Sequence, residues 1–115
     1  MPIHIVSAPV TLDELRRMAA EQFGDFVKAV VDVERGVMAI GGELHADEEA
    51  LLLQHGASQT GLWGINLYPD SPASELIEFD SMINVRPSQA NRSRGVEDAT
   101  LQQRIREIVG GLVVP

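Results

Sequence analysis

Residues 62–85 limit the possible folds most strongly, because apolar and polar side chains alternate along both halves of this stretch. Successive side chains of a β-strand point to opposite faces, so this alternation indicates strands over residues 62–68 and 76–85. The turn-forming residues 69–74 between them complete an antiparallel hairpin. A register that pairs apolar with apolar positions directs one set of side chains into the core: Trp63, Ile65, Leu67, Ile77 and Phe79.

A second hairpin is predicted earlier in the chain. Residues 27–33 alternate in the same way, and residues 37–40 form the returning strand. Gly36 lies in the short loop between them, where a glycine adopts a positive φ at little cost. A short β-branched strand over residues 3–6 precedes both hairpins, which brings the predicted number of strands to five.

Three helices are predicted from their caps and their apolar spacing. Thr11 and Glu14 have the spacing of a capping box at the start of the first helix, which ends at Gly24. The second helix covers about residues 46–55 and carries acidic residues in its first turn. The third begins near residues 97–98, and its apolar side chains recur with helical spacing: Leu101, Ile105, Ile108, Val109 and Leu112.

The predicted element order is β-α-β-β-α-β-β-α, which contains antiparallel hairpins and little room for parallel βαβ units. It favours an α+β fold with a five-stranded, mostly antiparallel sheet and three helices mainly on one face. A chain of 115 residues has the usual size of one domain. We therefore expect a single domain over residues 1–115.

The chain is acidic and contains no cysteine. Its 17 Asp and Glu against 9 Lys and Arg give a net charge of −8, which disfavours nucleic acid and anionic membranes as partners. The lack of cysteine excludes disulfides and thiolate sites and is typical of a reducing compartment. The first ten residues read as a strand rather than a signal peptide, and no apolar run reaches the roughly 18 residues that span a bilayer. We therefore expect a soluble, cytoplasmic protein.

The second hairpin also gathers polar side chains on one face of the sheet. Its predicted register sets Asn66 and Tyr68 beside Glu78 and Asp80. An antiparallel sheet that is covered on one side shows polar residues on the other simply because that side meets water. Apolar residues on the same face, Met82 among them, instead favour a face that a ligand or a partner covers. On that interpretation Asn66 and Tyr68 bind a ligand, and Glu78 and Asp80 are candidate acid/base groups.

Glu43, His45 and Asp47 alternate, so an extended backbone would direct all three side chains the same way. An imidazole and two carboxylates can hold a divalent metal, and His45 can also serve as an acid or a base. The acidic residues equally suit the positive end of the helix that follows, and no second histidine lies at a metal-like spacing. We therefore predict no cofactor and keep the three residues as candidate metal ligands.

Residues 81–96 contain no acidic side chain but three of the nine basic ones. Guanidinium groups bind carboxylates and phosphates in bidentate pairs, and nearby amides and hydroxyls add donors. This loop is therefore predicted to hold an anion, through the side chains of Arg86, Asn91, Arg92, Ser93 and Arg94. Asn84 is a further candidate ligand-binding residue, on the sheet face that carries Glu78 and Asp80. In a competing interpretation Arg86 pairs with Glu78 or Asp80, and Arg92 and Arg94 extend into solvent. The acidic residues 97–98 then satisfy the start of the last helix alone.

The sequence contains four runs that are specific in combination: GGELHADEEALLL, LWGINLYP, IEFDSMINVRP and NRSRGVED. They resemble the signature runs of a family of small prokaryotic single-domain proteins of unknown function, over about residues 3–112. The resemblance implies a stand-alone domain. It implies no activity and therefore transfers no catalytic residues.

These observations predict a small cytoplasmic binding or regulatory domain, with an anionic small molecule as its ligand. We expect a homodimer through the mixed sheet face or an exposed edge. The alternative is a small enzyme that acts on a phosphorylated or carboxylated substrate, with or without a divalent metal. A structural protein without a ligand is the third interpretation. An enzyme requires its polar groups to converge on one concave pocket, whereas a binding surface can be flat.

Overall fold

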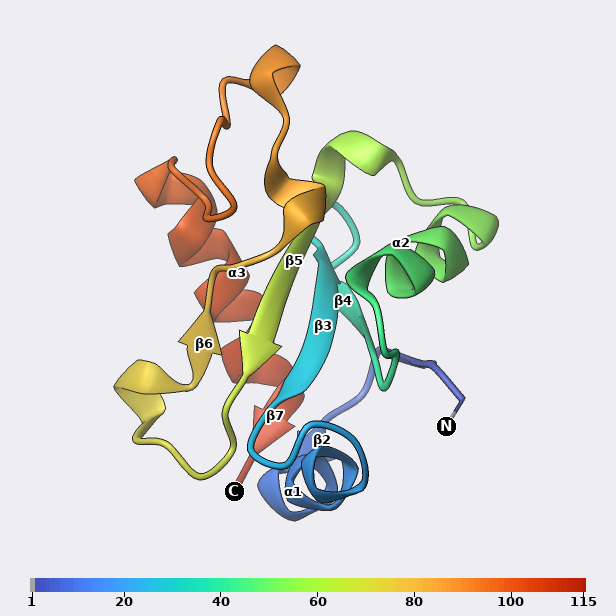
Figure 1. Ribbon diagram of the computed structural model, residues 1–115, viewed down its shortest axis with the longest axis vertical. Coiled ribbons are helices and arrows are strands. Elements are labelled where there is room, and N and C mark those ends of the chain that lie inside the picture. The colour runs from blue at the N-terminus through green and yellow to red at the C-terminus, as the bar shows by residue number, and fades with distance from the viewer. Residues whose placement is uncertain (1) are drawn as a thin grey trace.

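The computed structural model describes residues 2–115 and contains two sheets and three α-helices (Figure 1). The main sheet is antiparallel with strand order β1-β4-β3-β5-β6, which confirms the predicted α+β fold with a five-stranded sheet. Its strands are β1 (His4–Val6), β3 (Val27–Asp32), β4 (Val37–Ile40), β5 (Leu62–Leu67) and β6 (Ile77–Glu78). The helices are α1 (Leu12–Glu21), α2 (His45–Gln54) and α3 (Ala99–Leu112). A second, parallel pair joins β2 (Val10–Thr11) to β7 (Val113–Val114).

Two of the three helices begin where their capping residues predict. The Thr11 hydroxyl accepts a hydrogen bond of 3.1 Å from the Glu14 N–H at the start of α1. At the start of α3, the Asp98 carboxylate accepts from the N–H groups of Thr100 and Leu101. Helix α2 follows Leu44 and has no side-chain cap. No helix of residues 2–115 is both long and apolar enough to cross a membrane.

The two faces of the sheet are covered by different helices. Helices α1 and α3 pack on one face, where Trp63, Ile65 and Leu67 are buried and Ile77 and Phe79 are partly buried, as the register predicts. Helix α2 packs on the other face, and Figure 1 shows it on the opposite side of the sheet from α3. The expected placement of the helices mainly on one face therefore holds for α1 and α3 only.

The apolar composition of β3 explains why the sheet is covered on both sides. Val30 and Val31 are adjacent, so they point to opposite faces, and both are fully buried. Val31 belongs to the core beneath α1 and α3, whereas Val30 packs with Leu52 of α2. A strand that is apolar on both faces needs cover on both faces.

The prediction of a strand over residues 76–85 is wrong beyond Glu78. Strand β6 ends there, and residues 79–95 form an irregular segment that includes two short 3-10 helices, Met82–Asn84 and Pro87–Gln89. The Asn84 amide takes the place of a strand beside β5, because it accepts from the Gly64 N–H (2.8 Å) and donates to the Gly64 carbonyl (2.9 Å). The segment crosses Gly64 so closely that a Cβ there would lie 2.5 Å from the Ser81 Cβ.

Candidate functional site

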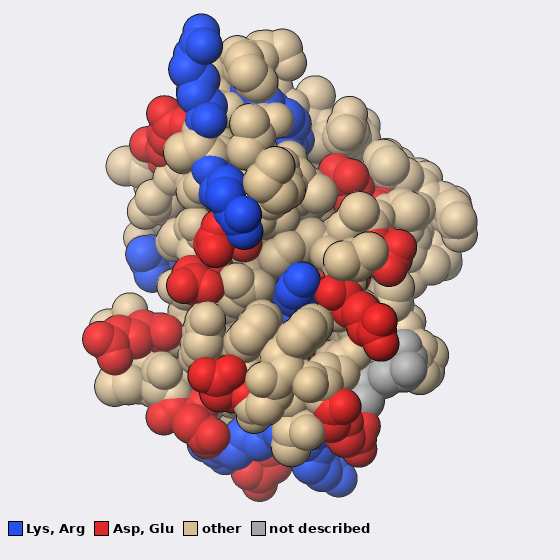
Figure 2. Space-filling view, viewed as in Figure 1, with Lys and Arg blue, Asp and Glu red and all other residues tan. Residues whose placement is uncertain are grey.

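A row of three polar side chains crosses the sheet on the face that α2 partly covers. Lys28 of β3 pairs with Asn66 of β5, and Asn66 pairs with Glu78 of β6. Directly paired residues of antiparallel strands point to the same face, so the three side chains lie side by side. The predicted neighbours Asn66 and Glu78 are confirmed. Figure 2 shows that both signs of charge lie on this face, among uncharged residues.

Glu78 connects two of the predicted ligand-binding residues. One of its carboxylate oxygens, Oε1, accepts a hydrogen bond of 2.8 Å from the Asn66 amide and another of 3.1 Å from the Tyr68 hydroxyl. Burial and the bond to Glu78 both raise the pKa of Tyr68, so the phenol keeps its proton at neutral pH and remains a donor.

Asn66 and Lys28 both carry polar groups that have no hydrogen-bond partner in the fold. Asn66 is 7% exposed, and its carbonyl oxygen Oδ1 is buried without a hydrogen-bond partner. The Lys28 ammonium lies 5.0 Å from the centroid of the Phe23 ring and makes no hydrogen bond or ion pair with any residue from 2 to 115. A buried acceptor and a half-buried cation without partners are uncommon in folded proteins, because both lose hydration.

A hollow of about 540 Å³ adjoins the Lys28 end of this row. Gln22 lines it, and its Nε2 donates to the Gly41 carbonyl (2.8 Å), while its Oε1 is buried and has no partner. The other lining residues include a ring, an ammonium and two carboxylates: Glu21, Phe23, Lys28, Glu43 and Leu44. The site therefore offers unused acceptors together with one unused cation.

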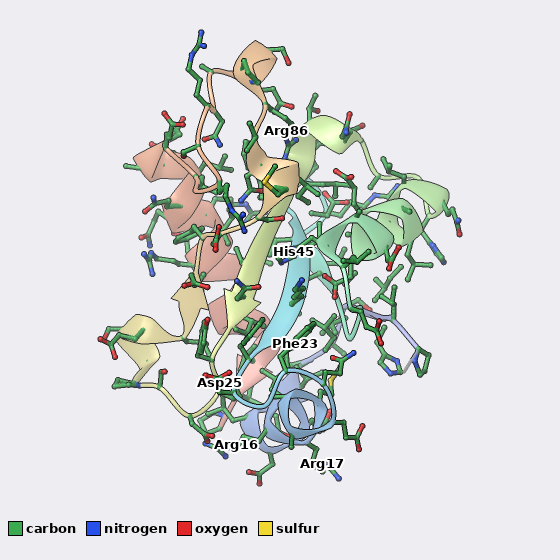
Figure 3. The ribbon with its side chains drawn as sticks, viewed as in Figure 1. Arg16, Arg17, Phe23, Asp25, His45 and Arg86 are labelled. Atoms are coloured by element: carbon green, nitrogen blue, oxygen red, sulfur yellow. The ribbon has the colours of Figure 1, made fainter. Side chains whose placement is uncertain are left out.

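His45 lies over the middle of this face, as Figure 3 shows. It is the first residue of α2 and is buried, and its Nε2 lies 2.8 Å from the Ile65 carbonyl oxygen. Burial lowers the pKa of His45, so the ring is neutral at neutral pH. A carbonyl only accepts, which assigns the proton to Nε2 and leaves Nδ1 as an acceptor. The imidazole can thus take up a proton at Nδ1.

Glu48 is a buried residue that the sequence interpretation placed among the helix-start acids. It is fully buried, Oε2 accepts a hydrogen bond of 3.0 Å from the Gly42 N–H, and Oε1 has no partner. Burial raises the pKa of Glu48 to about 9, so the carboxyl is uncharged at neutral pH. Its spacing from His45 and Leu52, three and four positions away, places it on the inward face of α2 and could have revealed its burial.

The three candidate metal ligands do not come together. Glu43 and Asp47 are exposed whereas His45 is buried, and no group of three or more His, Asp or Glu side chains within residues 2–115 has the arrangement of a metal site. The prediction assumed an extended backbone, but α2 begins at His45. Side chains two positions apart on a helix point in different directions.

Arg86 is occupied by the backbone of its own chain. Its guanidinium donates to the carbonyls of Ile83 (3.0 Å), Gln59 (2.7 Å) and Leu62, and it lies 4.0 Å from the centroid of the Trp63 ring. The side chain therefore ties the 83–91 segment to the start of β5. Neither Glu78 nor Asp80 is its partner, in contrast to the competing prediction.

Two amides predicted to bind a ligand, those of Asn84 and Asn91, shape the loop instead. Asn91 donates to the carbonyls of Asn84 (2.7 Å) and Gly95 (2.8 Å) and accepts from the Glu97 N–H (2.9 Å). The amide of Asn84 is bound to Gly64 and is fully buried. Both side chains are thus engaged within the fold.

The 92–94 segment already holds an anion, the carboxylate of Glu97. The N–H groups of Arg92 (2.7 Å) and Ser93 (2.8 Å) both donate to Glu97 Oε2, and these bonds lower the pKa of Glu97. The Ser93 hydroxyl accepts from the Gly95 N–H, and Arg94 forms an ion pair of 2.6 Å with Asp80. Of the arginines of this loop, Arg92 is the one whose guanidinium has no polar partner among residues 2–115.

The structure thus brings some predicted site residues together and separates others. Asn66, Tyr68 and Glu78 meet on one face with His45 and with Lys28, which the sequence interpretation did not include in the site. Asp80 and Arg94 form an ion pair within the irregular segment that follows β6. The remaining predicted ligand-binding residues belong to the loop: Asn84, Arg86, Asn91, Arg92 and Ser93.

Fold and site together define a small α+β domain with one apolar face and one face that carries buried polar groups. The chain belongs to DUF5674, a family described as a protein of unknown function, whose model matches residues 4–112. This match confirms the resemblance drawn from the four sequence runs. No curated protein and no solved structure gives a significant match to the chain.

Proposed function

We propose that this protein is a binding domain for a small polar molecule, which lies on the polar row formed by Lys28, Asn66 and Glu78. One observation carries the proposal: the carbonyl oxygen of Asn66 is buried without a partner, between a cation and a carboxylate on neighbouring strands. A hydrogen-bond donor of the ligand would satisfy this oxygen once the side chains around it turn aside to admit the donor.

The charges of the row define the ligand further. The unpaired Lys28 ammonium favours an anionic or other acceptor group, whereas Asn66 Oδ1 and the free oxygen of Glu78 favour donors. Neighbouring strands lie roughly 5 Å apart, so Lys28 and Glu78 are separated by roughly 10 Å across the sheet. A molecule with a carboxylate at one end and an amine or hydroxyls at the other fits this arrangement. The proposed ligand is therefore zwitterionic or neutral rather than purely anionic.

The loop of residues 86–94 supports an anion site less well. Its backbone donors are bound to Glu97, and the guanidinium groups of Arg86 and Arg94 are bound to carbonyls and to Asp80. Arg92 is the remaining unpaired guanidinium of the loop within residues 2–115. Arg92 serves as the matched control for Lys28, because substituting either residue removes one positive charge that has no ion-pair partner.

The experiment is a thermal-shift screen with amino acids, sugars and inorganic phosphate, repeated on Lys28→Met, Asn66→Ala and Arg92→Ala. A ligand that binds the folded state raises Tm as its concentration rises above Kd. We expect an amino acid or a sugar to raise Tm of the wild-type protein and of Arg92→Ala, and to lose this effect in Lys28→Met and Asn66→Ala. A shift that survives in Lys28→Met but disappears in Arg92→Ala would move the site to the loop and refute the proposal.

The homodimer and the cytoplasmic location stay predictions. The edge strand β1 carries no Lys, Asp or Glu, residues that commonly protect a sheet edge from pairing. Light scattering coupled to size-exclusion chromatography measures the mass in solution. A mass of one chain at every concentration tested would contradict the expected homodimer.

A further inference from the structure

A second cavity lies on the opposite face of the sheet from the polar row. It measures about 430 Å³ and is bounded by the start of α1, the segment before β6, the end of α3 and strand β7. Its walls are mainly aliphatic: Leu12, Leu76, Ile77, Val109 and Val113. Small-molecule sites in proteins usually measure roughly 300–1,000 Å³ and have mainly apolar walls with a few polar groups. The size and lining of this cavity fall within that class.

Gly110 lines the cavity and leaves open space at its Cβ position. It lies within α3, where glycine costs roughly 1 kcal/mol relative to alanine. Its φ is not positive, and a Cβ built on it would meet no atom within 4 Å. Neither the backbone conformation nor packing among residues 2–115 therefore requires a glycine here. A side chain at this position would instead extend along the cavity that Gly110 lines.

Arg106 supplies a cation beside the same cavity. It precedes Gly110 by one helical turn, so both residues lie on the same side of α3. Its guanidinium lies 5.0 Å from the centroid of the Phe79 ring and forms no ion pair or hydrogen bond with residues 2–115. The hydroxyl-bearing residues Ser71 and Ser74 also line the cavity. An unpaired guanidinium in a chain of net charge −8 favours an anionic group.

We propose that this cavity binds a small amphiphilic anion, with its apolar chain against the aliphatic walls and its carboxylate on Arg106. The chain would gain roughly 0.8 kcal/mol for each methylene buried. The carboxylate would form charge-assisted hydrogen bonds to the guanidinium, with the serine hydroxyls as further donors. This proposal is independent of the polar row, because none of the row's residues lines the cavity.

The test is a titration with decanoate, in which calorimetry and the NMR chemical shifts of the α3 amides measure binding. Acetate carries the same head group without the chain, and decan-1-ol carries the chain without the charge. We expect decanoate to bind and acetate to leave the NMR spectrum unchanged. The Arg106→Gln substitution should weaken the binding of decanoate about tenfold and leave the binding of decan-1-ol unchanged.

Gly110→Leu fills the cavity and is the decisive variant. Leucine is a better helix former than glycine, so the free protein keeps or increases its Tm while decanoate binding is lost. Gly111→Leu is the matched control, because Gly111 is also in α3 with nothing near its Cβ position but does not line the cavity. It should keep decanoate binding.

Three outcomes would overturn the proposal. Wild-type protein that does not bind decanoate would refute it, and so would equal binding by Gly110→Leu and Gly111→Leu. A wild-type dimer that Gly110→Leu converts to a monomer would show that a second copy of the chain occupies the cavity. The Lys28→Met variant should bind decanoate like the wild-type protein. A failure of the cavity proposal can therefore be distinguished from a failure of the proposed function at the polar row.

Discussion

The face of the sheet under α1 and α3 buries aliphatic and aromatic side chains, whereas the face under α2 also buries polar ones. His45, Glu48 and Asn66 are among the buried polar groups of the α2 face, and two of them keep an oxygen without a partner. Such groups lower the free energy of unfolding, because no hydrogen bond compensates for the loss of their hydration. The α1 and α3 face therefore holds the fold together, whereas the α2 face is less stable because it buries polar groups. A functional site is expected on the α2 face for that reason.

The largest effect is expected on the apolar face. Ile105 is fully buried, so Ile105→Ala should lower the free energy of unfolding by about 2–5 kcal/mol, through lost transfer energy and the cavity left behind. Leu53→Ala on α2 is the matched control, because Leu53 is 41% exposed and its loss should change stability by less than about 0.5 kcal/mol. Urea denaturation measures both. A loss below about 1 kcal/mol for Ile105→Ala would mean that α3 does not carry the core as described.

On the other face, Asn84→Ala should cost about 1–3 kcal/mol, because it leaves the N–H and carbonyl of Gly64 without their partners. Urea denaturation measures the loss, and the Gly64 amide should exchange its hydrogen faster. Ser88→Ala, an exposed residue of the same segment, should have almost no effect. An unchanged exchange rate at Gly64 would show that the Asn84 amide does not replace a strand.

Glu48 should make the α2 face sensitive to pH. Its pKa rises from 4.5 to about 9 on folding, so between these values the folded state holds a proton that the unfolded state has lost. Stability is therefore greatest below the unfolded pKa and falls as pH rises, with a slope on the order of 1 kcal/mol per pH unit. Urea denaturation from about pH 7 to pH 9 should show this fall in the wild-type protein and a smaller one in Glu48→Gln.

His45 acts in the opposite direction, which decides the pH range of that experiment. Burial lowers the pKa of His45 below 6.5, so its contribution to stability is lost as pH falls below that value. Measurements from neutral pH upward therefore isolate Glu48. Equal slopes for Glu48→Gln and the wild-type protein would contradict a neutral, buried Glu48.

The smallest effect is expected at the ion pair of Asp80 and Arg94. Its N···O distance is 2.6 Å, but the side chains are 42% and 57% exposed, so solvent screens the attraction. A double-mutant cycle with Asp80→Ala and Arg94→Ala should give a coupling energy of about 0–1 kcal/mol. A larger coupling energy would indicate that this pair, rather than the buried groups, organises the edge of the α2 face.

Local patterns in the sequence determined much of this protein. The capping residues Thr11 and Asp98 mark the starts of α1 and α3, because a cap depends on residues within one helical turn. Alternation predicted the register that places Asn66 beside Glu78, because a shift of one residue would move Trp63, Ile65 and Leu67 to the opposite face of the sheet. The α+β fold and the pairing of Asn66 with Glu78 therefore follow from periodicity alone, whereas the place of Lys28 beside Asn66 depends on the strand order.

The tertiary structure alone decided the path of residues 79–95 and the fate of the predicted anion loop. Alternation continues beyond Glu78, but Asn84 reaches Gly64, 20 positions away, and Arg86 reaches Gln59, 27 positions away. A hydrogen bond between distant residues has no periodic signature, so spacing could not reveal that these side chains serve the backbone. Burial decided the state of Glu48 as well, because the same carboxyl at the start of an exposed helix would be ionised.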